Sequence, residues 1–203
     1  MKLSRTIFSA LTLLCVCLIM SFSNANKPRL ILLDIGHGGV DKGAVFEDLT
    51  EHEINRAIAE HIKTLGNNEN VVVELLNENS GFLSLEERVE KIKTINPDLF
   101  ISIHIGSHKN GDARLLNAFY SENYKNQDQV TYLSKQLLEN LSEATNLKAT
   151  NPKASKFKIL RQNATPSIML ELGNLNNNDD REFITSEKGQ QQIAQSILEV
   201  VSR

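Results

Sequence analysis

Leu30-Ile-Leu-Leu-Asp-Ile-Gly-His-Gly-Gly39 joins an apolar run to a glycine-rich turn that carries one histidine, His37. The run has the length and composition of a strand that is buried on both faces, as at the centre of an α/β sheet. The glycines give the turn backbone conformations that branched residues avoid. Open α/β sheets build their sites just past the carboxyl ends of central strands, so the stretch predicts a site at His37. A tight loop with an incidental histidine is the alternative.

The first 25 residues have the pattern of a secretory signal peptide. Basic residues precede an apolar run, Ile7 to Met20, which is short for a bilayer span, and small residues follow up to Ala25. We expect cleavage after Ala25, with an uncleaved membrane anchor as the alternative. Residues 26–203 are then enough for one domain. This mature chain would be exported, to the periplasm or out of the cell, without a stable membrane anchor.

The composition limits which side chains of the mature chain can bind a metal and which partners it can have. Both cysteines, Cys15 and Cys17, fall in the predicted signal peptide, so His, Asp and Glu must hold any bound metal. The formal net charge of the full chain is -3 at pH 7, and the chain has no basic blocks, which argues against nucleic acid as a partner. It also contains no internal repeat and no separate binding module, and we expect a monomer.

Strand and helix patterns alternate along the mature chain. The predicted strands are Ile31–Leu33, Val71–Leu76, Leu99–Ile103, Leu115–Tyr120, Phe157–Leu160 and Ser167–Leu172. Helices are predicted after the capping boxes at Thr50 and Ser84, over Gln127–Thr145 and over Gln190–Val201, and Asn146–Ser155 is predicted to be a loop. The last two strands are joined by a link too short for a crossover, which predicts an antiparallel pair. The expected fold is an α/β three-layer sandwich, with a mostly parallel mixed sheet of about six strands flanked by helices.

Four ionisable side chains fall at corresponding places in this pattern. His37 follows the first strand, His104 ends the third, and Glu171 ends the last strand. Glu51 begins the helix that follows the His37 turn. If these strands are parallel neighbours, the four side chains gather at one edge of the sheet. Two imidazoles and a carboxylate can bind a catalytic zinc ion, and a second carboxylate can accept a proton from water.

Each of these residues also has a structural explanation. A histidine at a strand end is more often a hydrogen-bonded structural group than a metal ligand. Glu51 could be a first-turn acid stabilised by the helix dipole, and Glu171 could be a buried carboxylate paired with a basic side chain. However, Glu171 interrupts an apolar strand, where an uncompensated charge costs several kcal/mol. His108 is a rival ligand, whereas His52 and His61 are predicted to face solvent on a helix surface.

Five motifs along the chain resemble one known family. They are Asp34-Ile-Gly-His-Gly-Gly-Val-Asp-Lys-Gly-Ala44, Glu51-His-Glu-Ile-Asn55, Phe82-Leu-Ser-Leu-Glu-Glu-Arg88, Leu99-Phe-Ile-Ser-Ile-His104 and Leu170-Glu-Leu-Gly173. In this order they resemble the zinc-dependent N-acetylmuramoyl-L-alanine amidases of the type-3 amidase family. The resemblance runs from about Arg29 to Val201.

This resemblance implies a site and a reaction. It implies that His37, Glu51 and His104 bind one zinc ion per chain and that Glu171 is the catalytic carboxylate. It implies that the substrate is peptidoglycan, cleaved at the amide between the lactyl group of muramic acid and the L-alanine of the stem peptide. A secreted zinc peptidase acting on muropeptides and a catalytically silent cell-wall binding module remain as alternatives.

The resemblance also bears on control of the enzyme. Some amidases of this kind carry an inserted helix that blocks the cleft until a partner displaces it. That insertion lies between the last histidine ligand and the catalytic glutamate. Here the predicted elements occupy most of the interval from His104 to Glu171, and the leftover Ile105–Ala113 is short and polar. We therefore expect an open cleft and no obligatory activator.

Overall fold

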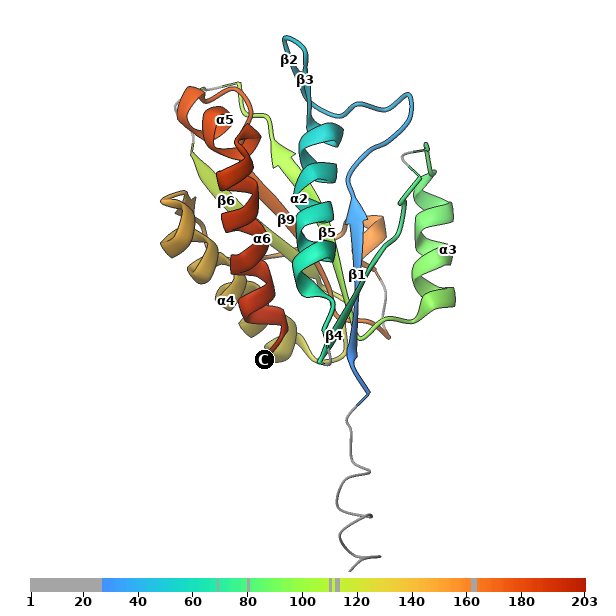
Figure 1. The fold of residues 1–203 in the computed structure, drawn as a ribbon. Coiled ribbons are helices and arrows are strands. Elements are labelled where there is room, and N and C mark those ends of the chain that lie inside the picture. Colours follow the sequence, from blue (N-terminus) through green and yellow to red (C-terminus); the bar gives the residue numbers. More distant parts are fainter. Residues whose placement is uncertain (1–26, 69, 80, 110, 112–113, 162–163) are drawn as a thin grey trace, which may run out of the picture.

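The computed structural model describes residues 27–203 except 69, 80, 110, 112–113 and 162–163 (Figure 1). The predicted signal peptide lies outside these residues. The strands are β1 (Arg29–Ile35), β2 (Val45–Phe46), β3 (Leu49–Thr50), β4 (Val71–Leu75), β5 (Leu99–Gly106), β6 (Leu115–Ser121), β7 (Lys148–Ala149), β8 (Lys153–Ser155) and β9 (Ser167–Asn174). The α-helices are α2 (Glu51–Gly66), α3 (Leu85–Ile95), α4 (Gln127–Thr145), α5 (Asn178–Thr185) and α6 (Glu187–Val201), and η1 (Lys158–Leu160) is a 3-10 helix. Among the described residues, no helix has both the length and the apolar character needed to cross a bilayer.

One mixed sheet organises the molecule. Its strands lie in the order β4-β1-β5-β9-β6-β7, and β8 also pairs with β6. Strands β4, β1, β5 and β9 pair with one another in parallel, whereas β6 runs antiparallel to β9. The predicted α/β sandwich with a mostly parallel mixed sheet is therefore confirmed. Because β1, β5 and β9 are parallel neighbours, their carboxyl ends meet at one edge of the sheet.

Helices cover both faces of this sheet (Figure 1). Helices α2, α4 and α6 pack on one face over a large apolar core to which alternate strand residues such as Leu33, Ile103 and Leu170 contribute. The residues between them, such as Leu32 and Phe100, face the opposite side, where they pack with Ile92 and Ile159 of α3 and η1. We call the first side the α2 face and the second the α3 face. The smaller second cluster fills the α3 face.

The helix starts follow the predicted capping residues. The Thr50 side chain accepts a hydrogen bond from the backbone N–H of Glu53 and begins α2, directly after the β2–β3 hairpin. Ser84 and Glu87 form a complete capping box at α3, and Asn96, in a left-handed conformation, ends that helix. Helix α4 has the predicted bounds.

Four details of the predicted pattern differ from the structure. The apolar residues near Phe157 form η1 instead of a strand, and the antiparallel partner of β9 is β6. The stretch predicted as a loop contains β7 and β8, which lie parallel to β6. Helix α5 was not predicted, because only Asp180 and Ile184 are buried on it and they make no apolar stripe. Ser186 then caps α6, which begins three residues before the predicted start.

Candidate metal centre

The glycine-rich turn after β1 places His37 at the carboxyl edge of the sheet. His37 has a positive φ of 67°, which is uncommon for a residue other than glycine. The buried Arg88 side chain of α3 donates hydrogen bonds to the backbone carbonyls of His37 and Ile35. Arg88 also forms a buried ion pair with Asp34 of β1. An arginine from the helix on the α3 face thus holds the turn in its unusual conformation.

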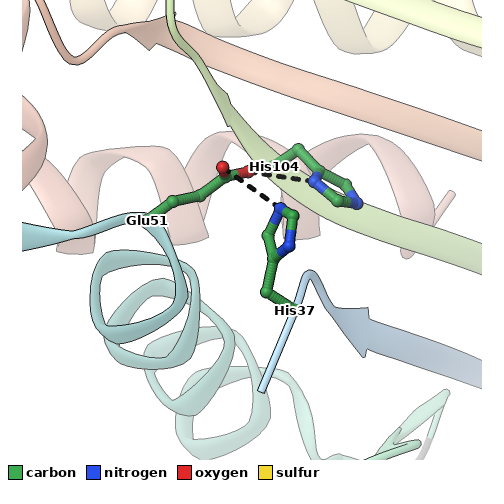
Figure 2. A group of neighbouring side chains, drawn as sticks. All are labelled: His37, Glu51 and His104. Carbon is green, nitrogen blue, oxygen red and sulfur yellow. Dashed lines mark hydrogen bonds and ion pairs between the residues drawn. The ribbon is translucent and has the colours of Figure 1, made fainter. Parts of the chain in front are cut away.

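The structure brings His37, Glu51 and His104 together, as Figure 2 shows. Nε2 of His37 lies 3.1 Å from Oε2 of Glu51, and Nδ1 of His104 lies 2.9 Å from Oε1 of the same carboxylate. The two imidazole rings meet edge to face with their centroids 5.1 Å apart. One ligand atom from each residue lies within 4.8 Å of the others. In the described part of the chain, these three residues form the only such group of His, Cys, Asp or Glu.

Backbone groups and glycines shape the surroundings of Glu51. The backbone N–H groups of Ala44 and Ile105 donate to its two carboxylate oxygens at 2.9 and 3.0 Å. A Cβ atom on Gly43 would lie 2.5 Å from Cδ2 of His37 and 2.6 Å from Oε2 of Glu51. Any side chain at position 43 would therefore collide with the group. Gly43 also has a positive φ of 68°, so both space and backbone conformation require glycine.

Asp41 is a part of the site that sequence reasoning missed. Its Oδ2 accepts a hydrogen bond from Nδ1 of His37 at 2.9 Å, and its Oδ1 accepts from the backbone N–H of Gly43 at 3.1 Å. With Nδ1 held by this carboxylate, the other ring nitrogen of His37 faces Glu51. Metal-binding histidines are commonly oriented by such a carboxylate. The available signal was an aspartate four residues after the histidine, within the same motif.

The charges of the group reinforce one another. The hydrogen bond with Glu51 raises the pKa of His37 to about 9; burial opposes this rise, and Asp41 adds to it. Burial acts to raise the pKa of the Glu51 carboxyl, but hydrogen bonds with His104 and His37 outweigh it and hold that pKa well below its usual range. Burial likewise acts to raise the pKa of the Asp41 carboxyl, but the hydrogen bond with His37 outweighs burial and lowers that pKa. Glu51 is therefore an anion at neutral pH that holds positive charge beside it.

This donor set suits a divalent metal ion. A carboxylate that attracts a proton onto the His37 imidazole also attracts a metal cation in its place, because ligand binding and proton release are coupled. Two imidazoles and one carboxylate, without cysteine, are typical protein ligands of a catalytic zinc ion. The ligand atoms already converge, and backbone N–H groups fix the carboxylate between the rings. The residues present therefore fit a metal.

Glu171 lies beside this group but makes its own contact. It is directly opposite His104 in the β5–β9 pairing, on the α3 face of the sheet. Its half-buried side chain accepts a hydrogen bond from Nδ2 of Asn117 at 3.1 Å, and Asn117 in turn accepts one from Thr150 at 2.9 Å. The basic partner considered from sequence is thus replaced by a neutral amide on β6.

The remaining histidines differ in their surroundings. His108 is exposed and is not part of the three-residue group in the described part of the chain. The prediction that His52 faces solvent is wrong, because His52 is 9% exposed and its Nδ1 lies 3.0 Å from the carbonyl oxygen of Gly36. His61 is half-buried, with Nε2 3.5 Å from a carboxylate oxygen of Glu187. His52 therefore contacts the turn that carries the first predicted ligand.

A cleft leads from the group over the α3 face. Its volume is about 350 Å³, and both His37 and His104 line it. Asp34 and Met169 of the sheet, the first turns of α3 and the η1 segment line the rest. Between His104 and Glu171, the only α-helix in the described residues is α4, which packs on the α2 face.

Comparison with known proteins identifies the family. The sequence profile of the N-acetylmuramoyl-L-alanine amidases, Amidase_3, matches residues 31–203. The chain belongs to this family. The uncharacterized protein YqiI of Bacillus subtilis (strain 168) is 30% identical over 172 residues, which cover 85% of this chain and 82% of YqiI. The N-acetylmuramoyl-L-alanine amidase LytC of the same strain is 28% identical over 82% of this chain. The match covers 34% of the length of LytC.

Solved structures of amidases share the fold. An N-acetylmuramoyl-L-alanine amidase from Clostridium difficile 630 superposes with a TM-score of 0.79 at 25% identity, covering 87% of this chain and 96% of that one. The CwlD amidase from Clostridioides difficile, solved in complex with the GerS lipoprotein, gives a TM-score of 0.76 at 26% identity. That match covers 85% of this chain and 96% of CwlD. The family and fold expected from the sequence motifs are thus confirmed.

Proposed function

We propose that the mature chain is a zinc-dependent N-acetylmuramoyl-L-alanine amidase with His37, Glu51 and His104 as the zinc ligands. The observation that carries this proposal is the convergence of these three side chains at the carboxyl edge of the sheet in a member of the amidase family. Its substrate is peptidoglycan, and the bond cleaved joins the lactyl group of muramic acid to the L-alanine of the stem peptide.

Zinc supplies Lewis-acid polarisation of a carbonyl group and lowers the pKa of water. The chain itself then has to move a proton, because an amide nitrogen leaves poorly as an anion. We assign this role to Glu171, which takes a proton from water and delivers it to the leaving nitrogen of L-alanine. Its position opposite His104 supports the assignment. The hydrogen bond from Asn117 orients the carboxylate of Glu171. A basic partner would neutralise the charge of this carboxylate, whereas the neutral amide does not.

The decisive experiment uses isolated peptidoglycan sacculi. The mature chain with zinc is incubated with sacculi, and the soluble products are analysed by mass spectrometry. The proposal requires release of stem peptides with a free L-alanine amino end. Cleavage within the stem peptide would instead identify a zinc peptidase. Binding to sacculi without release of peptides would identify a cell-wall binding module.

The location and control of the enzyme belong to the same proposal. The chain is exported by a signal peptide cleaved after Ala25 and acts in the periplasm or outside the cell as a monomer without an obligatory activator. Placement of α4 on the face opposite the cleft supports activity without a displacing partner. The sacculus experiment tests this part as well. No cleavage by the pure zinc-loaded chain, followed by cleavage after addition of an envelope extract, would contradict it.

A further inference from the structure

The cleft beside the metal group has an unusual apolar lining. Phe82, Leu85 and Phe157 are 55%, 40% and 44% exposed, and all three line the cleft. They come from the loop before α3, from the first residue of α3 and from the residue that precedes η1. Large exposed apolar side chains that gather from separate segments commonly mark a binding surface. The cleft therefore has the character of a ligand site and not of a solvated groove.

The Phe157 ring and the Phe82 backbone pack against other parts of the protein. The Phe157 ring packs edge to face against Phe119 of β6, with ring centroids 5.4 Å apart. The Phe82 backbone lies against Gly39 so closely that a Cβ atom on Gly39 would be 2.6 Å from its nitrogen. One wall of the cleft is thus fixed to the turn that carries His37, and the other to the sheet. The Phe157 ring and the Phe82 backbone therefore need little rearrangement when a ligand enters, which reduces the entropy lost on binding.

The charged side chains of the cleft are paired within the protein. Lys158 forms an ion pair with Glu86 of α3, and Arg88 forms a buried one with Asp34. The carboxylate of Asp41 forms an ion pair with the imidazole of His37. A ligand with ionised groups would have to compete with these partners. A ligand with uncharged, partly apolar surfaces can lie on the aromatic rings without breaking any of these ion pairs.

We infer that this cleft binds the glycan side of the substrate, with N-acetylated sugar rings lying against Phe82 and Phe157. This inference rests on the proposed function, because the scissile amide must lie at His37 and His104, which line the cleft. Stem peptides carry free carboxylates, whereas the sugar bearing the lactyl amide is uncharged. Its ring offers apolar C–H faces and an acetyl methyl group, which match amphipathic aromatic surfaces.

Direct binding measurements separate the two sides of the substrate. The probes are a short oligomer of N-acetylglucosamine, which is uncharged, and a free stem peptide. Each is titrated into the metal-loaded mature chain and followed by NMR chemical shifts. Phe157→Ala and Phe82→Ala should each weaken oligosaccharide binding by roughly two- to tenfold. Tyr132→Ala is the matched control, because Tyr132 is 66% exposed on α4, at the opposite face, and its loss should change nothing.

The outcomes distinguish this inference from the proposed function. Failure of the oligosaccharide to bind, or competition for the cleft by the stem peptide, would overturn the inference even if sacculi are cleaved. Saccharide binding that depends on the two phenylalanines, in a chain that releases no peptides from sacculi, would keep the glycan site and overturn the amidase. If both hold, Phe157→Ala should raise KM on sacculi while leaving zinc content unchanged.

Discussion

The two faces of the sheet are built from the same strands but have opposite characters. On the α2 face, Ile103 and Leu170 are fully buried beneath three helices. One residue further along the same strands, His104 and Glu171 are half-buried on the α3 face. Side chains alternate between faces along a strand, so a strand can supply the core and the site with successive residues. The closely packed face fixes the backbone, and the sparsely covered face leaves space for chemistry.

The largest expected effect follows from removing a ligand on the α3 face. His104→Ala should abolish zinc binding and reduce cleavage of sacculi to background, because one of the three convergent ligands is gone. Ile103→Val is the matched control from the α2 face. It should cost about 0.5–1.5 kcal/mol of stability and keep full zinc content. Zinc content by metal analysis, stability by urea unfolding and peptide release are measured on both. Normal turnover by a zinc-free His104→Ala chain would contradict the proposed site.

The next effect separates the two carboxylates of the site. Glu171→Gln should lower the rate by roughly 10²–10⁴-fold while keeping zinc, since it removes a proton acceptor and not a ligand. Glu51→Gln should instead weaken zinc binding, because this carboxylate lies between both imidazoles. Zinc affinity by competition with a chelator and turnover are compared for the two variants. The reverse pattern would exchange the roles of the two residues.

The sequence predicts those features of the two faces that depend on local residue patterns. Buried strands with a polar residue at the carboxyl end are visible in the chain at His104 and Glu171, and capping boxes locate α2 and α3. Sequence could not predict that Phe157 precedes a 3-10 helix, because a short apolar run has no periodicity to distinguish the two structures. The burial of His52 was also hidden, since its contact with Gly36 joins a helix to a distant turn.

A smaller effect is expected at Asp41, whose carboxylate orients His37 without belonging to the three-residue group. Asp41→Asn should weaken zinc binding by about 10- to 100-fold, as is typical for loss of the group that orients a metal-binding histidine. Asp48→Asn offers a control, because Asp48 is an exposed aspartate in the same loop region. Zinc affinities are compared by chelator competition. Equal affinities for the two variants would mean that the Asp41 hydrogen bond does not position the ligand.

The smallest effect is the pH dependence of stability in the metal-free chain, and it tests the charges of the group directly. The pKa of His37 is raised from 6.5 to about 9, chiefly by its hydrogen bond with Glu51. The folded state therefore binds the His37 proton more tightly than the unfolded state does. This contribution to stability is fully present below pH 6.5 and is lost as the pH rises through about 9. Thermal unfolding of the chelator-treated chain should accordingly show a falling Tm over this interval.

In Glu51→Gln the fall in Tm should be smaller, because the largest cause of the raised pKa of His37 has been removed, while the other titrating groups of the chain are unchanged. Bound zinc should also reduce it, since a coordinated imidazole carries no proton on the ligand nitrogen. A wild-type chain and a Glu51→Gln chain with parallel Tm profiles would show that His37 and Glu51 are not coupled in the folded state, and the electrostatic account of the three-residue group would then fail.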